Sequence, residues 1–223
     1  LIGNMPYSSK KMRDDIRMIR SYYGSRGYAD VSVVPDVREV EGAKVNIYYK
    51  ITPGTRKRVG RVNIQGNTKS QDRVIRREVP MRPGENYNSV DLETTKRRLQ
   101  NLGYFQNVDV TGTNSSQNGY RDVNILVQEQ KTGSINFGLG FSSIDSIIGR
   151  INLEQSNFDI TNWGRFTGAG QRFSVNLQIG AERTDFRVSL VEPWFLGQKL
   201  SLGTELYYRD LVFLSPEYDQ TNI

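Results

Sequence analysis

The chain has 223 residues, of which 36% are hydrophobic and 24% are charged, and it contains neither cysteine nor histidine. The lack of both residue types excludes a disulfide framework, metal sites built from thiolate or imidazole, and the commonest general base of enzymes. The net charge of +6 is unevenly distributed, because residues 1–132 carry 23 Lys and Arg against 14 Asp and Glu, whereas residues 133–223 carry 7 against 10. A basic first half fits either a well-solvated surface or contact with a polyanion or a membrane surface.

The sequence has no run of 18 apolar residues. This excludes a transmembrane helix but not a membrane protein built from strands, because such strands alternate between apolar and polar residues. The sequence begins at Leu1 without a basic and apolar leader, so we expect no signal peptide within it.

The first unit is predicted to combine one helix with two strands. A helix over residues 9–23 is indicated by apolar residues at helical spacing, namely Met12, Ile16, Ile19 and Tyr23. Strands are expected over residues 29–34 and 44–51, separated by a turn at Glu41-Gly42, and Pro53-Gly54 ends the unit.

The second unit is longer and is predicted to have the order β-α-α-β-β. Its expected elements are a strand over 58–65, helices over 70–79 and 89–102, and strands over 107–111 and 122–129. Gly103 is placed to end the second helix, which has acidic residues in its first turn and basic ones later, as the helix dipole favours.

The two units repeat each other. The segment Gly103–Val110 resembles Gly27–Val33, and Val123-Asn124-Ile125 repeats Val45-Asn46-Ile47. A unit that occurs twice indicates two copies of one domain. Because the first copy lacks a leading strand and a first helix, we expect the chain to begin inside a domain.

After Lys131 the helical spacing disappears and apolar residues alternate with polar ones. The alternation occurs around Ile135–Phe141, Ile151–Leu153, Phe173–Ile179, Phe186–Leu190 and Leu200–Tyr208. It predicts about five antiparallel strands with one apolar face, which suits a membrane β-barrel or a soluble sandwich. Aromatic residues near the strand ends favour the barrel, because such residues gather at membrane interfaces; they are Phe158, Trp163, Phe166, Trp194 and Phe195.

These motifs resemble the outer-membrane β-barrel insertase family of Gram-negative bacteria (BamA) and its transporter relatives. The two units resemble polypeptide-transport-associated (POTRA) domains in Gly66-Asn67, Pro83-Gly84 and Gly103-Tyr104-Phe105. The later part resembles the opening of the family's barrel in segments 133–140, 155–158 and 192–197.

The resemblance implies a fold class of α+β POTRA modules followed by an incomplete antiparallel transmembrane β-barrel, an up-and-down meander. The expected domains are a partial POTRA domain (1–54), a complete POTRA domain (55–131) and the first strands of a truncated barrel (132–223). It also implies that residues 142–149 and 180–185 lie on the outer side of the membrane. Residues 157–170 and 192–199 are expected at the periplasmic interface.

The implied function is assembly and insertion of β-barrel proteins into the outer membrane. Its implied partners are unfolded outer-membrane proteins, periplasmic lipoproteins or chaperones, and the lipid bilayer. An incoming strand would pair with the first barrel strand at a lateral seam formed by Ser134, Ile135, Asn136, Phe137, Gly138, Leu139, Gly140 and Phe141. The POTRA edges that would bind extended segments by β-augmentation contain Val31, Val33, Val108 and Val110. No catalytic residue, cofactor or metal is expected.

Several alternatives stay open at this point. Gly138 and Gly140 either allow a seam to open or relieve crowding in a curved sheet. A secretion transporter of the same superfamily would share these motifs. A basic α+β module that binds nucleic acid is a further alternative, although the sequence lacks the stacking aromatics of an RNA-binding sheet, so no nucleic-acid partner is expected.

Overall fold

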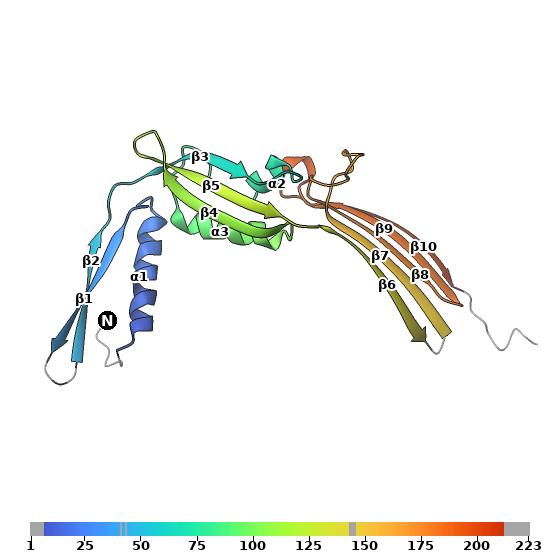
Figure 1. The fold of residues 1–223 in the computed structure, drawn as a ribbon, viewed down its shortest axis with the longest axis horizontal. Helices are drawn as coiled ribbons and strands as arrows, with labels where there is room; N and C mark the ends of the chain where they lie inside the picture. Colours follow the sequence, from blue (N-terminus) through green and yellow to red (C-terminus); the bar gives the residue numbers. More distant parts are fainter. Residues whose placement is uncertain (1–6, 41, 43, 143–145, 212–223) are drawn as a thin grey trace, which may run out of the picture. The chain divides into compact units, whose positions relative to one another are not determined.

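A computed structural model describes residues 7–40, 42, 44–142 and 146–211 (Figure 1). In chain order, its elements are α1 (Ser9–Gly24), β1 (Ser32–Val40), β2 (Lys44–Thr52), β3 (Arg58–Gln65), α2 (Asp72–Arg76), α3 (Ser89–Asn101), β4 (Phe105–Asn114), β5 (Tyr120–Glu129), β6 (Gly133–Ser142), β7 (Ser146–Phe158), β8 (Gln171–Ile179), β9 (Arg183–Glu192), the 3-10 turn η1 (Phe195–Gly197) and β10 (Leu202–Leu211). None of the helices described is long and apolar enough to cross a membrane. By their contacts, residues 1–67 and 75–128 form one unit, and residues 68–74 and 129–223 form a second.

The first copy in unit 1 is a helix packed against a two-stranded hairpin. Helix α1 begins after Ser8, whose hydroxyl accepts a hydrogen bond from the Lys11 amide and caps the helix. Strands β1 and β2 pair antiparallel from Ser32 opposite Thr52 to Val40 opposite Lys44. The Tyr49 hydroxyl of β2 lies 3.0 Å from the Asp15 carboxylate of α1 and joins the helix to the hairpin.

Strand β1 differs from the sequence prediction in both position and length. It begins at Ser32 and reaches Val40, whereas the prediction covered residues 29–34. The sequence pattern does not indicate a strand beyond Val34, because Pro35 and the charged residues after it are of types that are depleted in strands. Pairing with the strongly alternating β2 nevertheless keeps this segment extended.

The second copy in unit 1 has the order β3-α2-α3-β4-β5 and confirms the predicted β-α-α-β-β fold. Its sheet has the strand order β3-β5-β4, and β3 runs parallel to β5. Helix α3 lies along the sheet (Figure 1) and buries Leu99. The core also contains fully buried side chains from three strands, namely Val59, Val108, Val123 and Ile125.

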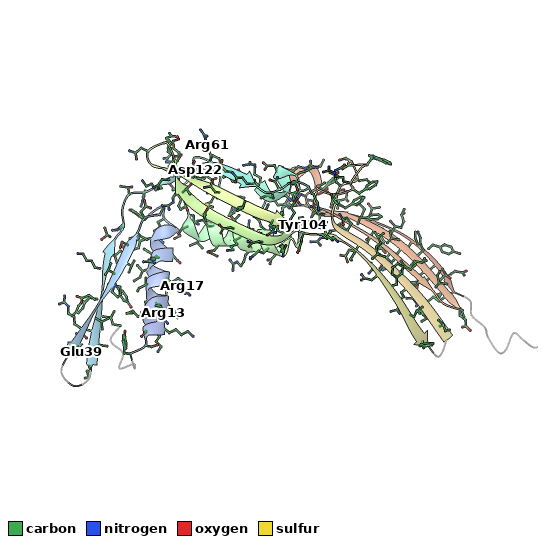
Figure 2. All side chains as sticks on the ribbon, in the orientation of Figure 1. Arg13, Arg17, Glu39, Arg61, Tyr104 and Asp122 are labelled. Atoms are coloured by element: carbon green, nitrogen blue, oxygen red, sulfur yellow. The ribbon has the colours of Figure 1, made fainter. Side chains whose placement is uncertain are left out.

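Polar bonds fix the pairing of β3 with β5. The Arg61 amide donates to the Asp122 carboxylate at 2.8 Å, and Figure 2 shows both residues at the same end of the sheet. Further along, the amides of Asn63 and Asn124 join the two strands at 2.9 Å. Gly66, with φ of +90°, ends β3 in a conformation that suits glycine.

Helix α2 spans five residues, Asp72–Arg76, and the predicted helix over 70–79 was too long. At its front, the Ser70 amide donates to Glu129 and the Gln71 amide to the Gly168 carbonyl, which gives hydrogen-bond partners to the amides that precede the helix. After Arg76, the Glu78 and Val79 amides donate to carbonyls three residues back, which closes the helix with a tighter turn.

Unit 2 contains the predicted meander. Its sheet has the strand order β10-β9-β8-β7-β6, and every neighbouring pair is antiparallel (Figure 1). The β8–β9 turn is tight, because the Gly180 amide donates to the Arg183 carbonyl at 2.8 Å. Strand β7 begins at Ser146, inside the segment 142–149 that was expected on the outer side of the membrane; residues 143–145 lie outside the described residues.

The two faces of this sheet differ in chemistry. Cross-strand registers place one row of apolar residues beside the next, for example Phe137 opposite Ile151, Leu177 and Phe186 in successive strands. The apolar side chains on β6 are open to the surroundings, with exposed fractions of 77% for Phe137 and 84% for Leu139. In the described part of the chain, no second sheet covers this face, which argues against a soluble sandwich.

The opposite face is polar and its side chains bond across the strands. Arg150 donates to the Gln178 side chain at 3.0 Å, and the hydroxyls of Ser174 and Ser189 lie 2.8 Å apart. Ion pairs of this face join Arg187 to Glu205 and both Arg183 and Arg209 to Asp185. A sheet with one bonded polar face and one open apolar face is typical of a barrel wall between water and lipid.

Candidate functional site

Strand β6 lies at one edge of the five-stranded sheet. It pairs with β7 from Gly133 opposite Gln155 to Ser142 opposite Ser146. In the part of the chain that the structure describes, no strand pairs with its other edge. A row of backbone donors and acceptors is therefore available there to an added strand.

Two of the glycines of β6, Gly138 and Gly140, are not crowded in this sheet. A Cβ atom added at Gly140 would meet no heavy atom within 4 Å. One added at Gly138 would meet only the Arg150 Cβ at 3.9 Å, an ordinary contact. Within the described sheet, this geometry gives no sign of steric pressure at Gly138 and Gly140. The physical consequence of the two glycines is that strand pairing is weak and the strand bends easily at these positions.

The remaining predicted seam residues alternate between the two faces of β6. Ser134 and Asn136 lie on the polar face, opposite Glu154 and Asn152 of β7. The apolar face carries Ile135, Phe137, Leu139 and Phe141, which are between 59% and 85% exposed. A strand pairing with this edge would continue the same alternation.

The predicted POTRA edge residues divide into three classes. Val31 precedes β1 and is not part of a strand, so its assignment to an edge strand was wrong. Val33 is buried on β1, one of the two strands of its sheet. Val108 is buried and Val110 half-buried on β4, the outer strand of the sheet β3-β5-β4. The valines therefore anchor these strands, and only the backbone edges are open to a further strand.

Three of the predicted interface aromatics form one cluster. The ring of Phe158 stacks on Phe166 at 5.9 Å and on Phe173 at 4.8 Å, and Trp163 lies 6.3 Å from Phe166 while remaining 81% exposed. Sequence reasoning placed Phe173 on a strand but did not connect it with the cluster. Trp194 and Phe195 lie at the β9–β10 turn, which the meander places at the same end of the sheet.

A polar network in unit 2 was missed by sequence reasoning. The Glu129 carboxylate accepts four hydrogen bonds from the preceding segment of the unit, from the Thr68 amide and hydroxyl and from the Lys69 and Ser70 amides, at 2.6–3.0 Å. Burial alone would raise the pKa of Glu129, but these hydrogen bonds outweigh it and hold the pKa below its ordinary value.

The same network continues into the loop after β7. The buried Asn157 amide donates to the Ser70 hydroxyl at 2.9 Å and accepts from the Gly170 amide. The buried Asp159 accepts from the Gln71 side chain at 2.7 Å and from Thr161. We name Glu129, Asn157, Asp159 and residues 68–71 the clasp. Its only sequence signal is polar residues beside strand ends, which is too common to be specific.

The described residues contain no group of three or more acidic side chains placed to hold a metal ion. The described arrangement offers a strand edge without a partner strand, an apolar sheet face and hydrogen-bonded polar residues.

Comparison with known proteins decides the family. The POTRA family profile (surface antigen variable number repeat) matches residues 3–54 and 57–130, more than half of the chain, and the Omp85 superfamily domain matches residues 165–223. Outer membrane protein assembly factor BamA of Neisseria meningitidis is 27% identical over 208 residues, which cover 90% of this chain and 24% of that protein. The chain belongs to the POTRA family and is similar to BamA.

Solved structures agree with this fold. BamA from Haemophilus ducreyi lacking POTRA domains 1–3 superposes with a TM-score of 0.81 at 24% identity, over 95% of this chain and 38% of that one. CdiB from Escherichia coli superposes less well, with a TM-score of 0.52 at 13% identity over 92% of this chain and 37% of that one.

The relatives that this chain matches are named outer membrane protein assembly factors. The chain spans about a quarter of the length of the curated BamA relatives that it matches. The predicted resemblance and fold class are confirmed.

Proposed function

We propose that this chain acts in the assembly and insertion of β-barrel proteins into the outer membrane. Its clients would be unfolded outer-membrane proteins, and its role would be non-enzymatic. The observation that carries the proposal is the unpaired edge of β6 beside an exposed apolar face. Such an edge can template a new strand while the apolar face remains in lipid.

In this proposal, an incoming client strand pairs with the backbone of Ser134–Phe141 and is later released into the bilayer. Release requires that the pairing be reversible. Gly138 and Gly140 contribute no side-chain packing to a neighbouring strand, and the space around them is open. The weakest pairing therefore lies in the middle of β6.

The POTRA part would receive extended client segments, or periplasmic lipoprotein or chaperone partners, by β-augmentation. The open backbone edges of β1 and β4 support this role. The corresponding domains would span residues 1–54, 55–131 and 132–223. The aromatic residues Phe158, Trp163, Phe166, Trp194 and Phe195 would then lie at the periplasmic membrane interface, where exposed Trp163 is favourable.

The test replaces Gly138 and Gly140 by valine, together, in the full-length protein. Because a Cβ is accommodated at both positions, the variant should fold, and the added β-branched side chains should strengthen strand pairing and stiffen β6. We expect client insertion into vesicles to slow at least tenfold. The matched control is Gly149→Val in β7, where a Cβ would also meet only a 3.9 Å contact but both edges are paired. Equal insertion rates for the two variants would contradict the seam.

A secretion transporter is the second candidate, because the fold is shared with CdiB. The two functions differ in what is released: an inserted barrel in one case and a soluble passenger in the other. A vesicle assay that scores both products from the full-length protein distinguishes them.

A further inference from the structure

A hollow of about 400 Å³ lies in unit 2 at the end of the sheet where β9 turns into β10. Its lining includes the charged Arg73 and Glu192, the amide of Gln171, and the aromatic Trp194 and Phe195. By the meander, this is the same end of the sheet as the aromatic cluster around Phe158. It is therefore the expected periplasmic interface of the membrane.

The hollow opens on the apolar face of the sheet. Leu190 and Leu202 contribute to its lining, and Leu190 lies opposite Phe173 in the apolar rows. Leu196 also lines it, with 81% of its surface exposed and a φ of +55° that is rare for a leucine. An exposed apolar side chain held in this backbone conformation is favourable where hydrocarbon surrounds it.

Two opposite charges border this apolar surface. Glu192 follows Val188 and Leu190 on the same face of β9, where a carboxylate would be costly in contact with lipid. Its position is fixed, because it accepts from the Trp194 amide at 2.9 Å and from the Gln171 side chain at 3.1 Å. Arg73 is exposed and presents a guanidinium, which suits a phosphate.

We propose that this hollow binds the head group of a zwitterionic aminophospholipid. The phosphate binds Arg73, the primary ammonium donates to the Glu192 carboxylate beside the Trp194 indole, and the acyl chains lie along Leu190 and Leu202. An anionic lipid supplies the phosphate but leaves Glu192 without a cation. A choline lipid has a quaternary nitrogen that cannot donate a hydrogen bond to Glu192. The site does not depend on the proposed insertion mechanism.

Trp194 makes the test direct. The chain has two tryptophans, so Trp163→Phe leaves Trp194 as the only indole. This protein, in uncharged detergent micelles, is titrated with short-chain phosphatidylethanolamine while the Trp194 emission is recorded. We expect a saturable change that is at least tenfold weaker with phosphatidylglycerol or phosphatidylcholine.

Variants on the same background assign the charges. We expect Arg73→Gln and Glu192→Gln each to weaken phosphatidylethanolamine binding at least tenfold, and Glu192→Gln to remove the preference over phosphatidylglycerol. The matched control is Arg172→Gln, an exposed arginine next to Gln171 on β8 but on the other face, which should change binding less than twofold. Because Glu192 also accepts a backbone bond, Arg73→Gln decides the matter if Glu192→Gln does not fold.

Three results would overturn the proposal. The first is a non-saturating change that is equal in all variants, which indicates ordinary partitioning into micelles. The second is phosphatidylglycerol binding as tight as phosphatidylethanolamine binding and unaffected by Glu192→Gln. The third is full competition by inorganic phosphate at the concentration of the lipid, which indicates an anion site without head-group recognition.

Discussion

Replacing Glu129 by glutamine should loosen the clasp of unit 2. The glutamate accepts four hydrogen bonds with its two oxygens, one at Oε1 from Ser70 and three at Oε2 from Thr68 and Lys69. Glutamine has one oxygen and one amino group. In the more favourable orientation of the glutamine side chain, its oxygen keeps the three hydrogen bonds from Thr68 and Lys69. Its amino group then faces the Ser70 amide, and because both groups are donors, that hydrogen bond is lost. The remaining three bonds also lose the negative charge of their acceptor.

The size of the effect follows from these bonds. A hydrogen bond to a charged group contributes ~1.5–3 kcal/mol when buried, and a neutral one ~0.5–1.5 kcal/mol. The loss of one bond and of the charge on three others would amount to about 6 kcal/mol at full burial. Glu129 is only partly buried, so water replaces part of each bond. We therefore expect the clasp to lose about 2 kcal/mol, which corresponds to about 30-fold more opening.

Amide hydrogen exchange of Thr68, Lys69 and Ser70 measures this opening directly, because it reports local rather than global unfolding. The matched control is Glu93→Gln, an exposed glutamate on α3. Exchange that changes less than threefold in Glu129→Gln would refute the assignment of these bonds to a stabilising clasp.

The pH dependence provides an independent check. The pKa of Glu129 is lower in the folded chain than in the unfolded one, where it is about 4.3. Its stabilisation is therefore complete above that ordinary pKa and is lost as the pH falls through the folded pKa. Protection of the three amides, corrected for intrinsic exchange, should fall over this acidic range in the wild type and stay flat in Glu129→Gln.

Two further predictions concern the POTRA sheet and the barrel wall. Gly66→Ala should lower the free energy of unfolding of unit 1 in urea by about 2 kcal/mol more than the control Gly119→Ala does. Both residues have positive φ, but only at Gly66 would the added Cβ lie 1.9 Å from the Val127 carbonyl oxygen. Equal losses in the two variants would contradict this close approach. Phe137→Asp should weaken partitioning of the chain into vesicles by about 2–3 kcal/mol. The control Asn136→Asp, on the polar face, should leave partitioning nearly unchanged. A similar loss in both variants would contradict the assignment of the two faces.

Local sequence correctly predicted the elements that carry several independent sequence signals, such as caps, charge placement and regular apolar spacing. Helix α3 has a cap at Asn88, acidic and basic residues at its correct ends and a glycine stop at Gly103, and its bounds differ from the prediction by one residue. Alternation likewise located β8 and β9. The prediction failed at β1, which its pairing with β2 extends beyond the predicted bounds, and at α2, which ends early in a tighter turn closed by the Glu78 and Val79 amides.

The clasp shows why a site of this kind is invisible in the sequence. Asn157 and Asp159 were assigned only to a loop with aromatic residues, and Glu129 only to the end of a strand. Their hydrogen bonds join segments separated by 59 to 88 residues. No rule of sequence spacing connects such positions, because each residue type is common beside a strand end. The residues find their hydrogen-bond partners only when the fold brings the three segments together.

The repeated tripeptide Val-Asn-Ile separates what local sequence determines from what it leaves open. In both copies it forms a strand with the asparagine on the opposite face from its apolar neighbours. In β5, Asn124 bonds to Asn63 of β3 on one side and to Thr113 of β4 on the other, so the strand is central. In β2, the same tripeptide lies in a sheet whose described part contains only β1 as a partner. Sequence therefore sets the face of a strand, whereas the occupancy of its edge depends on which other strand is present. The same reasoning applies to β6: its alternation sets which side of the strand is apolar, whereas no strand among the described residues specifies the neighbour at its outer edge.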